Sequence, residues 1–428
     1  MQVDFPYKEF GPVQVPNANL AGIFGCPEAD GPADAGELTA AALAHPRGTP
    51  PLRELAAGRK KVLVVTDDVS RPTPVHILLP PLLRALKQAG VEDSSIEFLM
   101  ALGTHRFMTR EEMSRKLGPG IVERYAVSNH DWKDRDACKF VGSTPQGAEV
   151  WVNRKVFEAD LVIGIGRIMP IDICGFTGGG KILIPGVCGE VTNSDMHWTR
   201  LGVPDEDVVG RRDNPIRQAI DEMARKAGLD FIINVVMDSA QRIAAVVTGD
   251  MVEAHRKGCE AARCLHEVKV PCPADIVIAD GYPFDNEFWQ VNKALDTAGR
   301  AVRKGGVVIV VSPCYEGFSA THPEIPRLGY RAVADVIGMV ESGVIKDKVV
   351  GVHMVQVGKV AKEKASVILV TTGISAEDVR KAGLLHAPTP SAALDTAFAM
   401  LGSDARVVVL RNAAEMLVRG TVDEGVKE

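Results

Sequence analysis

The sequence has little of what marks a nucleic-acid-binding or membrane protein. Lys and Arg number 49 against 55 Asp and Glu, so the net charge of −6 excludes a protein built around a broad basic face. Aromatic residues make up only 5% of the chain, which argues against base-stacking platforms. The longest apolar runs, such as residues 75–83, are short and interrupted by proline, so no membrane span is expected.

The N-terminus and the cysteines indicate a cytoplasmic protein. Residues 1–12 lack the basic patch and the apolar stretch of a signal peptide. The 8 cysteines are scattered over 428 residues and do not form a disulfide scaffold, so reduced thiols in a cytoplasm fit better. This length and the 46% of hydrophobic residues suffice for two or three domains with large cores. We therefore expect a cytoplasmic globular enzyme.

Short β-branched runs alternate with helix-like segments along the chain. Continuous apolar strands, such as residues 61–66, are typical of a sheet that is buried on both faces. The pattern predicts an α/β fold of two domains, each with a largely parallel sheet flanked by helices. Because Pro271 and Pro273 suit a joint, we expect an N-terminal domain over 1–270 and a C-terminal domain over 271–428.

Periodicity also predicts individual elements. The other predicted strands are 95–101, 122–127, 161–165, 276–279, 307–311, 349–354, 367–370 and 406–410. The predicted helices are 81–89, 110–116, 294–303, 331–342, 376–382 and 392–401. The stretch up to about residue 58, rich in Ala, Gly and Pro, is interpreted as an irregular approach to the first strand.

Polar clusters follow four predicted strands at their carboxyl ends. They are Asp67, Asp68, Ser70 and Arg71; Thr104, His105 and Arg106; His130 and Asp131; and a long loop that ends in GFTGGGKILIPG, residues 175–186. Ligands of open α/β sheets bind beyond the carboxyl ends of the strands. Four such clusters in succession therefore predict a binding cleft.

The glycine-rich loop imitates a phosphate-binding P-loop without matching it. Residues 175–181 spell G-x-x-x-x-G-K, but Ile182 stands where Ser or Thr would hold magnesium, and Pro185 follows. The three glycines at 178–180 would let backbone amides approach an anion such as a phosphate. The alternative, which can hold at the same time, is a tight turn that needs positive φ.

Four motifs together resemble the nickel-dependent lactate racemase family. They are DDVSRPTP (67–74), ALGTHR (101–106), GFTGGGKILIPG (175–186) with a histidine downstream, and GYPFDNEFWQVNKAL (281–295). The resemblance extends from about residue 60 to 300 and is weaker beyond. It implies a nickel-pincer nucleotide, the pyridinium-3-thioamide-5-thiocarboxylic acid mononucleotide, which holds Ni²⁺ through two sulfurs and a ring carbon.

The resemblance assigns residues to this cofactor. Lys181 matches the cofactor-binding lysine, which in some members is attached covalently through a thioamide bond. His197 matches the histidine that is the fourth nickel ligand, and imidazole suits nickel(II). Alone, His197 would be interpreted as a surface or capping histidine. The other residues assigned to the cofactor are Asp68, Ser70, Thr177, Gly178, Gly179 and Gly180.

Further matches concern the substrate. His105 corresponds to one of two catalytic histidines, and an imidazole can take and return a proton at neutral pH. Arg71 matches an arginine near the substrate, where its planar fork could hold a carboxylate. From the second domain, Trp289, Gln290 and Lys293 match residues that line the substrate side, and Lys293 would neutralise a carboxylate or polarise a ketone. We therefore expect the active site in the cleft between the two domains.

The sequence departs from the family at two places. The second catalytic histidine lies ten positions before the cofactor lysine, where this chain has Ile171, which cannot transfer a proton. Asp172 could do so from one residue out of register. His353 stands near the place of a family tryptophan. These departures predict a substrate different from lactate and larger.

The resemblance thus implies an isomerase, a racemase or epimerase that inverts C2 of a 2-hydroxyacid. His105 would take the hydroxyl proton while C2 hydride moves to the pyridinium ring, and a transient 2-keto acid would receive the hydride back. The alternatives are lactate racemase itself and a non-catalytic nickel-pincer nucleotide-binding or carrier protein. The expected partners are a small-molecule 2-hydroxyacid and cofactor-maturation proteins, with neither nucleic acid nor membrane.

Overall fold

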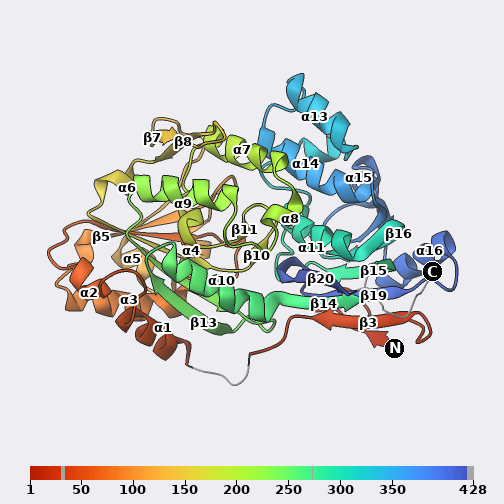
Figure 1. Ribbon diagram of the computed structural model, residues 1–428, viewed down its shortest axis with the longest axis horizontal. Helices are drawn as coiled ribbons and strands as arrows, with labels where there is room; N and C mark the ends of the chain where they lie inside the picture. The colour runs from red at the N-terminus through yellow and green to blue at the C-terminus, as the bar shows by residue number, and fades with distance from the viewer. Residues whose placement is uncertain (30–33, 272, 422–428) are drawn as a thin grey trace. The chain divides into compact units, whose positions relative to one another are not determined.

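A computed structural model describes residues 1–29, 34–271 and 273–421, and the chain divides into two compact units (Figure 1). The central unit spans Pro27–Leu265, and the terminal unit combines Met1–Cys26 with His266–Glu428. Each unit contains a six-stranded sheet in which parallel pairs dominate, so the predicted α/β class is confirmed. Within the described residues, no helix has the length and apolar character needed to cross a membrane.

The sheet of the central unit has the strand order β13-β12-β9-β4-β5-β6. Its parallel strands are β4 (Val62–Asp67), β5 (Ile96–Ala101), β6 (Ala126–Asn129), β9 (Leu161–Arg167) and β12 (Phe231–Met237). The edge strand β13 (Ile243–Gly249) runs antiparallel to β12. The strands β5, β4 and β9 are consecutive neighbours, so their carboxyl ends lie at one edge of the sheet.

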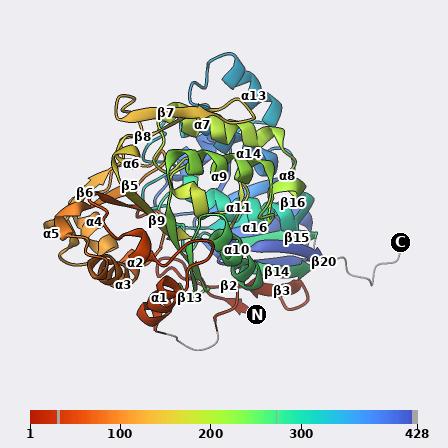
Figure 2. The same cartoon turned by 60° about the vertical axis from the view of Figure 1, so that its left-hand side comes forward.

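Both faces of this sheet are covered by helices. In β4, Leu63 and Val65 face a core shared with α9 (Pro215–Ala227) and α10 (Glu253–His266). The alternate residues of the strand face a second core, shared with α1 (Ala35–Ala44) and α3 (Val75–Gln88), which pack against each other (Figure 2). The continuous apolar strands are explained by this burial on both faces.

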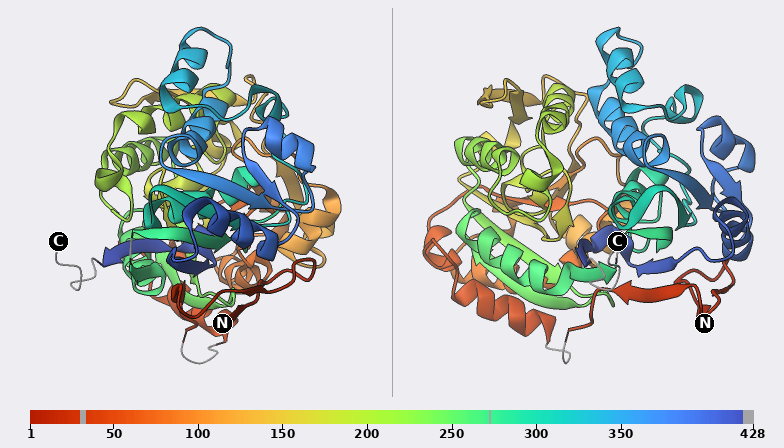
Figure 3. Two further views of the ribbon diagram at one scale, coloured as in Figure 1. Left: turned by 90° about the vertical axis from the view of Figure 1, so that its right-hand side faces the viewer. Right: turned by 45° about the vertical axis from the view of Figure 1, so that its right-hand side comes forward.

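The sheet of the terminal unit has the order β18-β17-β16-β15-β19-β3, with every neighbouring pair parallel. Its strands are β3 (Leu20–Gly25), β15 (Ala274–Asp280), β16 (Val302–Val311), β17 (Ala365–Val370), β18 (Leu385–Ala387) and β19 (Val407–Arg411). The strand β3, red in Figure 3, lies beside β19 at the sheet edge. The first 26 residues therefore belong to the terminal unit, which differs from their predicted place in the N-terminal domain.

Helices flank the terminal sheet as well. They are α11 (Phe288–Ala301), α13 (Val333–Glu341), α14 (Lys348–Ala361), α15 (Ala376–Lys381) and α16 (Pro390–Leu401). The helix α16 shares a core with one face of the sheet, together with apolar residues of the first fifteen positions. The helices α11 and α14 pack against each other and against the sheet strands β15, β16 and β17.

Short elements complete the chain. In the central unit they are α2 (Leu52–Leu55), η1 (Asp93–Ser95), α4 (Arg110–Leu117), α5 (Ile121–Arg124), β7 (Cys138–Ser143), β8 (Glu149–Asn153), α6 (Lys155–Glu158), β10 (Pro170–Ile171), β11 (Gly175–Phe176), η2 (Gly179–Ile182), α7 (Glu190–Thr199), η3 (Arg200–Gly202) and α8 (Asp205–Val208). In the terminal unit they are β1 (Gln2–Val3), β2 (Val13–Gln14), β14 (Glu267–Pro271), α12 (Ile325–Leu328), η4 (Ala413–Glu415) and β20 (Leu417–Thr421).

Three predictions about elements are wrong. The strand predicted at 349–354 is part of the helix α14, whose valines are buried almost throughout, so no polar face revealed the helical period. The strand predicted at 122–127 is the turn of α5 followed by β6. The N-terminal stretch contains β3 and α1, because β3 obtains its hydrogen bonds from the distant β19 rather than from a local partner.

Candidate active site

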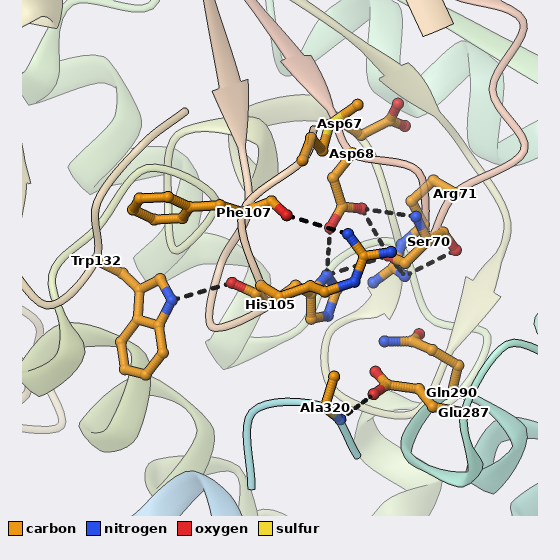
Figure 4. Close-up of polar contacts among 12 residues, drawn as sticks. Asp67, Asp68, Ser70, Arg71, His105, Phe107, Trp132, Glu287, Gln290 and Ala320 are labelled. Carbon is orange, nitrogen blue, oxygen red and sulfur yellow. Dashed lines mark hydrogen bonds and ion pairs between the residues drawn. The ribbon is translucent and has the colours of Figure 1, made fainter. Parts of the chain in front are cut away.

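A hydrogen-bonded cluster lies where β4 and β5 end (Figure 4). The Asp68 Oδ2 atom is 2.6 Å from His105 Nδ1, and Ser70 Oγ donates to Asp68 Oδ1 at 2.6 Å. Burial alone would raise the pKa of Asp68, but the adjacent His105, with Arg71 and Ser70, holds that pKa below its usual value. An ionised carboxylate on Nδ1 leaves Nε2 of the neutral imidazole as the proton acceptor.

Two residues that the sequence did not predict fix the loops of this cluster. Lys116, on α4, donates to the carbonyl oxygen of Arg71 at 2.6 Å and forms an ion pair with Asp67 at 2.8 Å. The indole of Trp132 donates to the carbonyl oxygen of His105 at 3.1 Å (Figure 4). Both come from segments distant in sequence, so no local pattern could have identified them.

Arg71 completes the cluster. Its Nη1 atom donates to Ser70 Oγ at 2.8 Å, so one edge of the guanidinium is joined to the same serine that contacts Asp68. The side chain is partly exposed. Its charge also acts on Lys181, whose pKa it lowers, so the Arg71 and Lys181 side chains lie within electrostatic reach of each other.

Lys181 lies on the short helix η2 with a partly buried side chain. Its ammonium hydrogen-bonds to none of the residues that the structure describes. Burial lowers the pKa of this ammonium, and the positive charges of Arg71 and Arg217 lower it further, while Cys174 and Asp172 act in the opposite direction. An amine in this setting suits an anionic or acylating group.

The glycines beside Lys181 are tightly enclosed by the protein itself. An added Cβ would lie 2.6 Å from Ile168 at Gly178, 3.0 Å from His255 at Gly179 and 2.9 Å from Ala224 at Gly180. The φ angles of Gly178 and Gly179 are +79° and +60°, and the Gly179 amide donates to Asn234 Oδ1 at 2.8 Å. Thr177 donates to the carbonyl oxygen of Arg167 at 2.8 Å. This geometry favours the tight-turn interpretation of the loop.

His197 lies on α7 with its ring partly exposed. Its Nδ1 atom donates to the carbonyl oxygen of Asn193 at 2.7 Å. This hydrogen bond places the proton on Nδ1 and the lone pair on Nε2, the form in which histidine binds metals. The helix α7 is joined to the His105 loop, because Glu190 N–H donates to the carbonyl oxygen of Trp132 at 2.8 Å.

The structure distinguishes Ile171 from Asp172. Ile171 lies on β10, opposite Gly175 of β11, and packs against the core of the central unit. The Asp172 charge reaches Lys181 and raises its pKa, and the Asp172 carbonyl accepts from Arg200 at 2.7 Å. Of these two neighbours, only Asp172 offers a group that can hold a proton near Lys181.

The other predicted residues lie in the terminal unit, at the start of α11. Lys293 donates to Gln290 Oε1, and its ammonium lies 5.1 Å from the centroid of the Phe284 ring. The Trp289 indole is stacked between two imidazoles rather than enclosed in an aliphatic core. At the same helix end, Glu287 accepts from Ala320 N–H at 2.9 Å (Figure 4).

No group of three or more His, Cys, Asp or Glu residues in the described ranges could hold a metal ion by itself. A centre that needs one histidine, with the remaining donors from an organic group, is compatible with the geometry of His197.

Comparison with known proteins gives consistent matches along the chain. Residues 8–208 match the lactate racemase N-terminal domain, and residues 269–418 match the lactate racemase C-terminal domain. Lactate racemase of Thermoanaerobacterium thermosaccharolyticum is 34% identical over 293 residues, and that of Lactiplantibacillus plantarum is 33% identical over 283 residues. Each match covers 66% of this chain and 66% of the relative, so the chain spans about two thirds of the length of these relatives.

Two solved structures are similar in fold. The lactate racemase apoprotein from T. thermosaccharolyticum has a TM-score of 0.87 and 28% identity, covering 98% of this chain and 100% of that chain. A Thermotoga maritima protein has a TM-score of 0.71 and 24% identity, covering 91% of this chain and 100% of that chain. The second likeness concerns the fold alone.

Proposed function

The chain belongs to the lactate racemase family, and we propose that it is a nickel-dependent racemase or epimerase that inverts C2 of a 2-hydroxyacid. The observation that carries this proposal is the contact between Asp68 and His105, at the carboxyl ends of adjacent strands. A buried carboxylate that orients an imidazole is suited to taking a proton from the C2 hydroxyl and returning it.

Two residues of the central unit would hold a nickel-pincer nucleotide. Lys181 presents an amine with no hydrogen bond to a described residue and with a lowered pKa, which suits non-covalent binding as well as the covalent attachment known in the family. His197 would ligate nickel through Nε2, since Nδ1 donates to Asn193. When bound, the nucleotide would supply the pyridinium carbon that takes hydride from C2 and returns it.

The remaining assignments concern this chain's own side chains. His105 would accept the hydroxyl proton, and Arg71 would bind the substrate carboxylate. On the side of the missing histidine, either Asp172, within electrostatic reach of Lys181, accepts the proton, or both enantiomers present their hydroxyl to His105. Lys293 and Gln290 of the terminal unit would contact the substrate as well. Asp68 and Ser70 remain predicted nucleotide contacts, but their contacts with His105 favour a role in orienting that histidine.

The substrate we propose is larger than lactate. Lactate is small and nearly symmetric about C2, so efficient inversion needs a proton acceptor on each side. Ile171 is apolar and packs on the core, so a longer acid that is re-anchored by its own tail would present its hydroxyl to His105 more readily. A carrier that binds the nucleotide without turnover is the second candidate, favoured only by Ile171; Arg71, Gln290 and Lys293 would have no purpose in it.

The test combines composition with catalysis. Protein produced together with cofactor-maturation proteins in the cytoplasm is analysed for nickel and by mass spectrometry. Both enantiomers of lactate and of larger 2-hydroxyacids are then incubated in water and in deuterium oxide and separated by chiral chromatography. We expect larger acids to be inverted faster than lactate with the C2 hydrogen retained. Equal rates for lactate and every larger acid contradict the substrate assignment, and rapid C2 deuteration contradicts hydride transfer.

A further inference from the structure

The indole of Trp289 is covered on both faces by imidazole rings. The ring centroids lie 4.5 Å from His322 and 4.4 Å from His353, with interplanar angles of 28° and 16°. Both histidines are 3% exposed, whereas Trp289 itself is partly exposed. Only the edge of the indole is therefore open to a ligand, because each of its faces is already in contact with a ring.

The indole N–H lies on that edge. It donates no hydrogen bond to any residue of the described ranges, although such donors usually find a partner when they are partly buried. Trp289 and Lys293 are four residues apart on α11, so their Cβ atoms lie about 6 Å apart on one helix face. A substrate that contacts Lys293 through its carboxylate or its C2 oxygen can therefore extend its tail to the indole edge.

Each ring that covers Trp289 lies beside a further polar side chain. Tyr330 Oη lies 2.9 Å from His353 Nε2, and burial lowers the pKa of His353 to about 3, so this ring is neutral. On the other face, His322 Nδ1 lies 3.7 Å from Asp347 Oδ2. The indole is therefore packed between one ring that is hydrogen-bonded to Tyr330 and a second ring that lies near the Asp347 carboxylate.

The charges around Trp289 discriminate among possible substrate tails. Two carboxylates belong to this cluster, Asp347 beside His322 and the 5% exposed Glu287 immediately before α11. A tail that carries a second carboxylate would be repelled by both. A phenyl tail cannot stack on an indole whose faces are occupied. A tail with a neutral oxygen can accept the indole hydrogen bond.

We propose that His322 and His353 are positioning residues that hold Trp289 edge-on, so that its N–H donates to a neutral oxygen on the substrate tail. The substrate class is then a 2-hydroxyacid with a hydroxylated, uncharged tail. This inference rests on the proposed racemase function, and it adds which of the larger 2-hydroxyacids, distinguished by their tails, the site prefers.

The test uses acids that differ in one group. The holoenzyme is assayed with 2,4-dihydroxybutanoate and with 2-hydroxypentanoate, in which a methyl replaces the tail hydroxyl, and with malate and 3-phenyllactate. We expect kcat/KM for the dihydroxy acid to exceed that for its methyl analogue about tenfold, the value of one hydrogen bond made in a closed site. Trp289→Phe keeps the stack but removes the N–H, and should reduce this ratio to about one, mainly through KM.

Variants of His322 test the positioning role. His322→Ala opens one indole face, so the dihydroxy preference should fall and 3-phenyllactate should be accepted better. His322→Phe restores a covering ring and should restore the preference, which a general loss of stability would not do. His386→Ala, in β18 of the same unit and outside this cluster, is the matched control. If His322→Ala does not fold, Trp289→Phe and His322→Phe still decide the matter.

The outcomes separate this inference from the proposed function. Inversion of acids without a preference for the hydroxylated tail, or an unchanged ratio in Trp289→Phe, overturns the inference and leaves the racemase proposal intact. The same acids are also titrated calorimetrically into the full-length holo-protein. Preferential binding of the dihydroxy acid without any inversion supports the indole contact and overturns the racemase function. Neither binding nor inversion of any acid overturns both.

Discussion

The carboxylate of Asp68 contacts His105 at Nδ1, with 2.6 Å between the oxygen and the nitrogen. The contact joins the residue that follows β4 to a loop that follows β5, two neighbouring parallel strands. Since the pKa of Asp68 is held below its usual value, the carboxylate stays ionised at neutral pH and keeps the Nδ1 proton in place. The ring thus presents Nε2 as a base without any change in its tautomer.

This contact predicts the effect of two substitutions on turnover. His105→Ala removes the base and should lower kcat by roughly 10²- to 10⁴-fold, the usual contribution of general base catalysis. Asp68→Asn should lower kcat as well, because an amide that donates to Nδ1 fixes the wrong tautomer. His105→Ala should keep its nickel, since His105 is assigned neither as a nickel ligand nor as a nucleotide contact. His76→Ala, an exposed histidine on α3, is the control. Unchanged kcat in His105→Ala would remove this residue from the mechanism.

Nickel retention tests His197. In His197→Ala the neutral imidazole that completes the coordination is absent, so we expect nickel to be lost while the fold is kept. Elemental analysis of the purified variant gives the occupancy, and circular dichroism checks the fold. His76→Ala again serves as the matched histidine control. Nickel at the wild-type level in His197→Ala would contradict the assignment.

Lys181 distinguishes a nickel nucleotide from a nucleoside triphosphate. Lys181→Ala removes the amine with no hydrogen bond to a described residue and should release or loosen the cofactor, as seen by mass spectrometry. Lys226→Ala, an exposed lysine on α9, should retain it. A P-loop would instead bind ATP or GTP, and the wild-type protein should give no heat with either in a calorimetric titration. Binding of a triphosphate that depends on Lys181 would reverse the interpretation of the glycine loop.

Much of the central sheet could be predicted from sequence because its strands are buried on both faces and are therefore continuously apolar. The same logic placed Asp68 and His105 at strand ends that lie together. It failed for α14, where a run of buried valines hides the helical period, and for β3, whose partner β19 lies far along the chain.

The contacts that complete the candidate site were not predictable in this way. Lys116 and Trp132 reach Arg71 and His105 from segments distant in sequence, and a single sequence contains no signal for such a contact. The stack on Trp289 was not predictable either. His322 lies in a loop, and His353 lies in α14, which the sequence pattern predicted as a strand, so only the tertiary structure brings the three rings together.

The last prediction concerns His353 and the stability of the protein toward acid. Burial lowers the pKa of His353 to about 3, whereas an ordinary histidine titrates near 6.5. Between these values the unfolded chain binds a proton that the folded chain does not, so this residue makes the protein less stable as pH falls. Buried Asp280 acts oppositely: its pKa is raised to about 7, so its contribution to stability rises as pH falls through the same range. The pH dependence of the total stability is therefore not diagnostic, and the difference in stability between variant and wild type is measured instead.

At pH 8, His353→Phe should be less stable than wild type by about 1 kcal/mol, because the Tyr330 hydroxyl loses its partner. From pH 6.5 downward the free energy of unfolding of the variant should rise, relative to that of the wild type, by up to ~1.4 kcal/mol per pH unit. Urea denaturation of the full-length protein between pH 8 and 4.5 measures both values, with His76→Phe as the exposed control. A difference between His353→Phe and wild type that stays constant over this range would show that His353 is not held neutral in the folded protein.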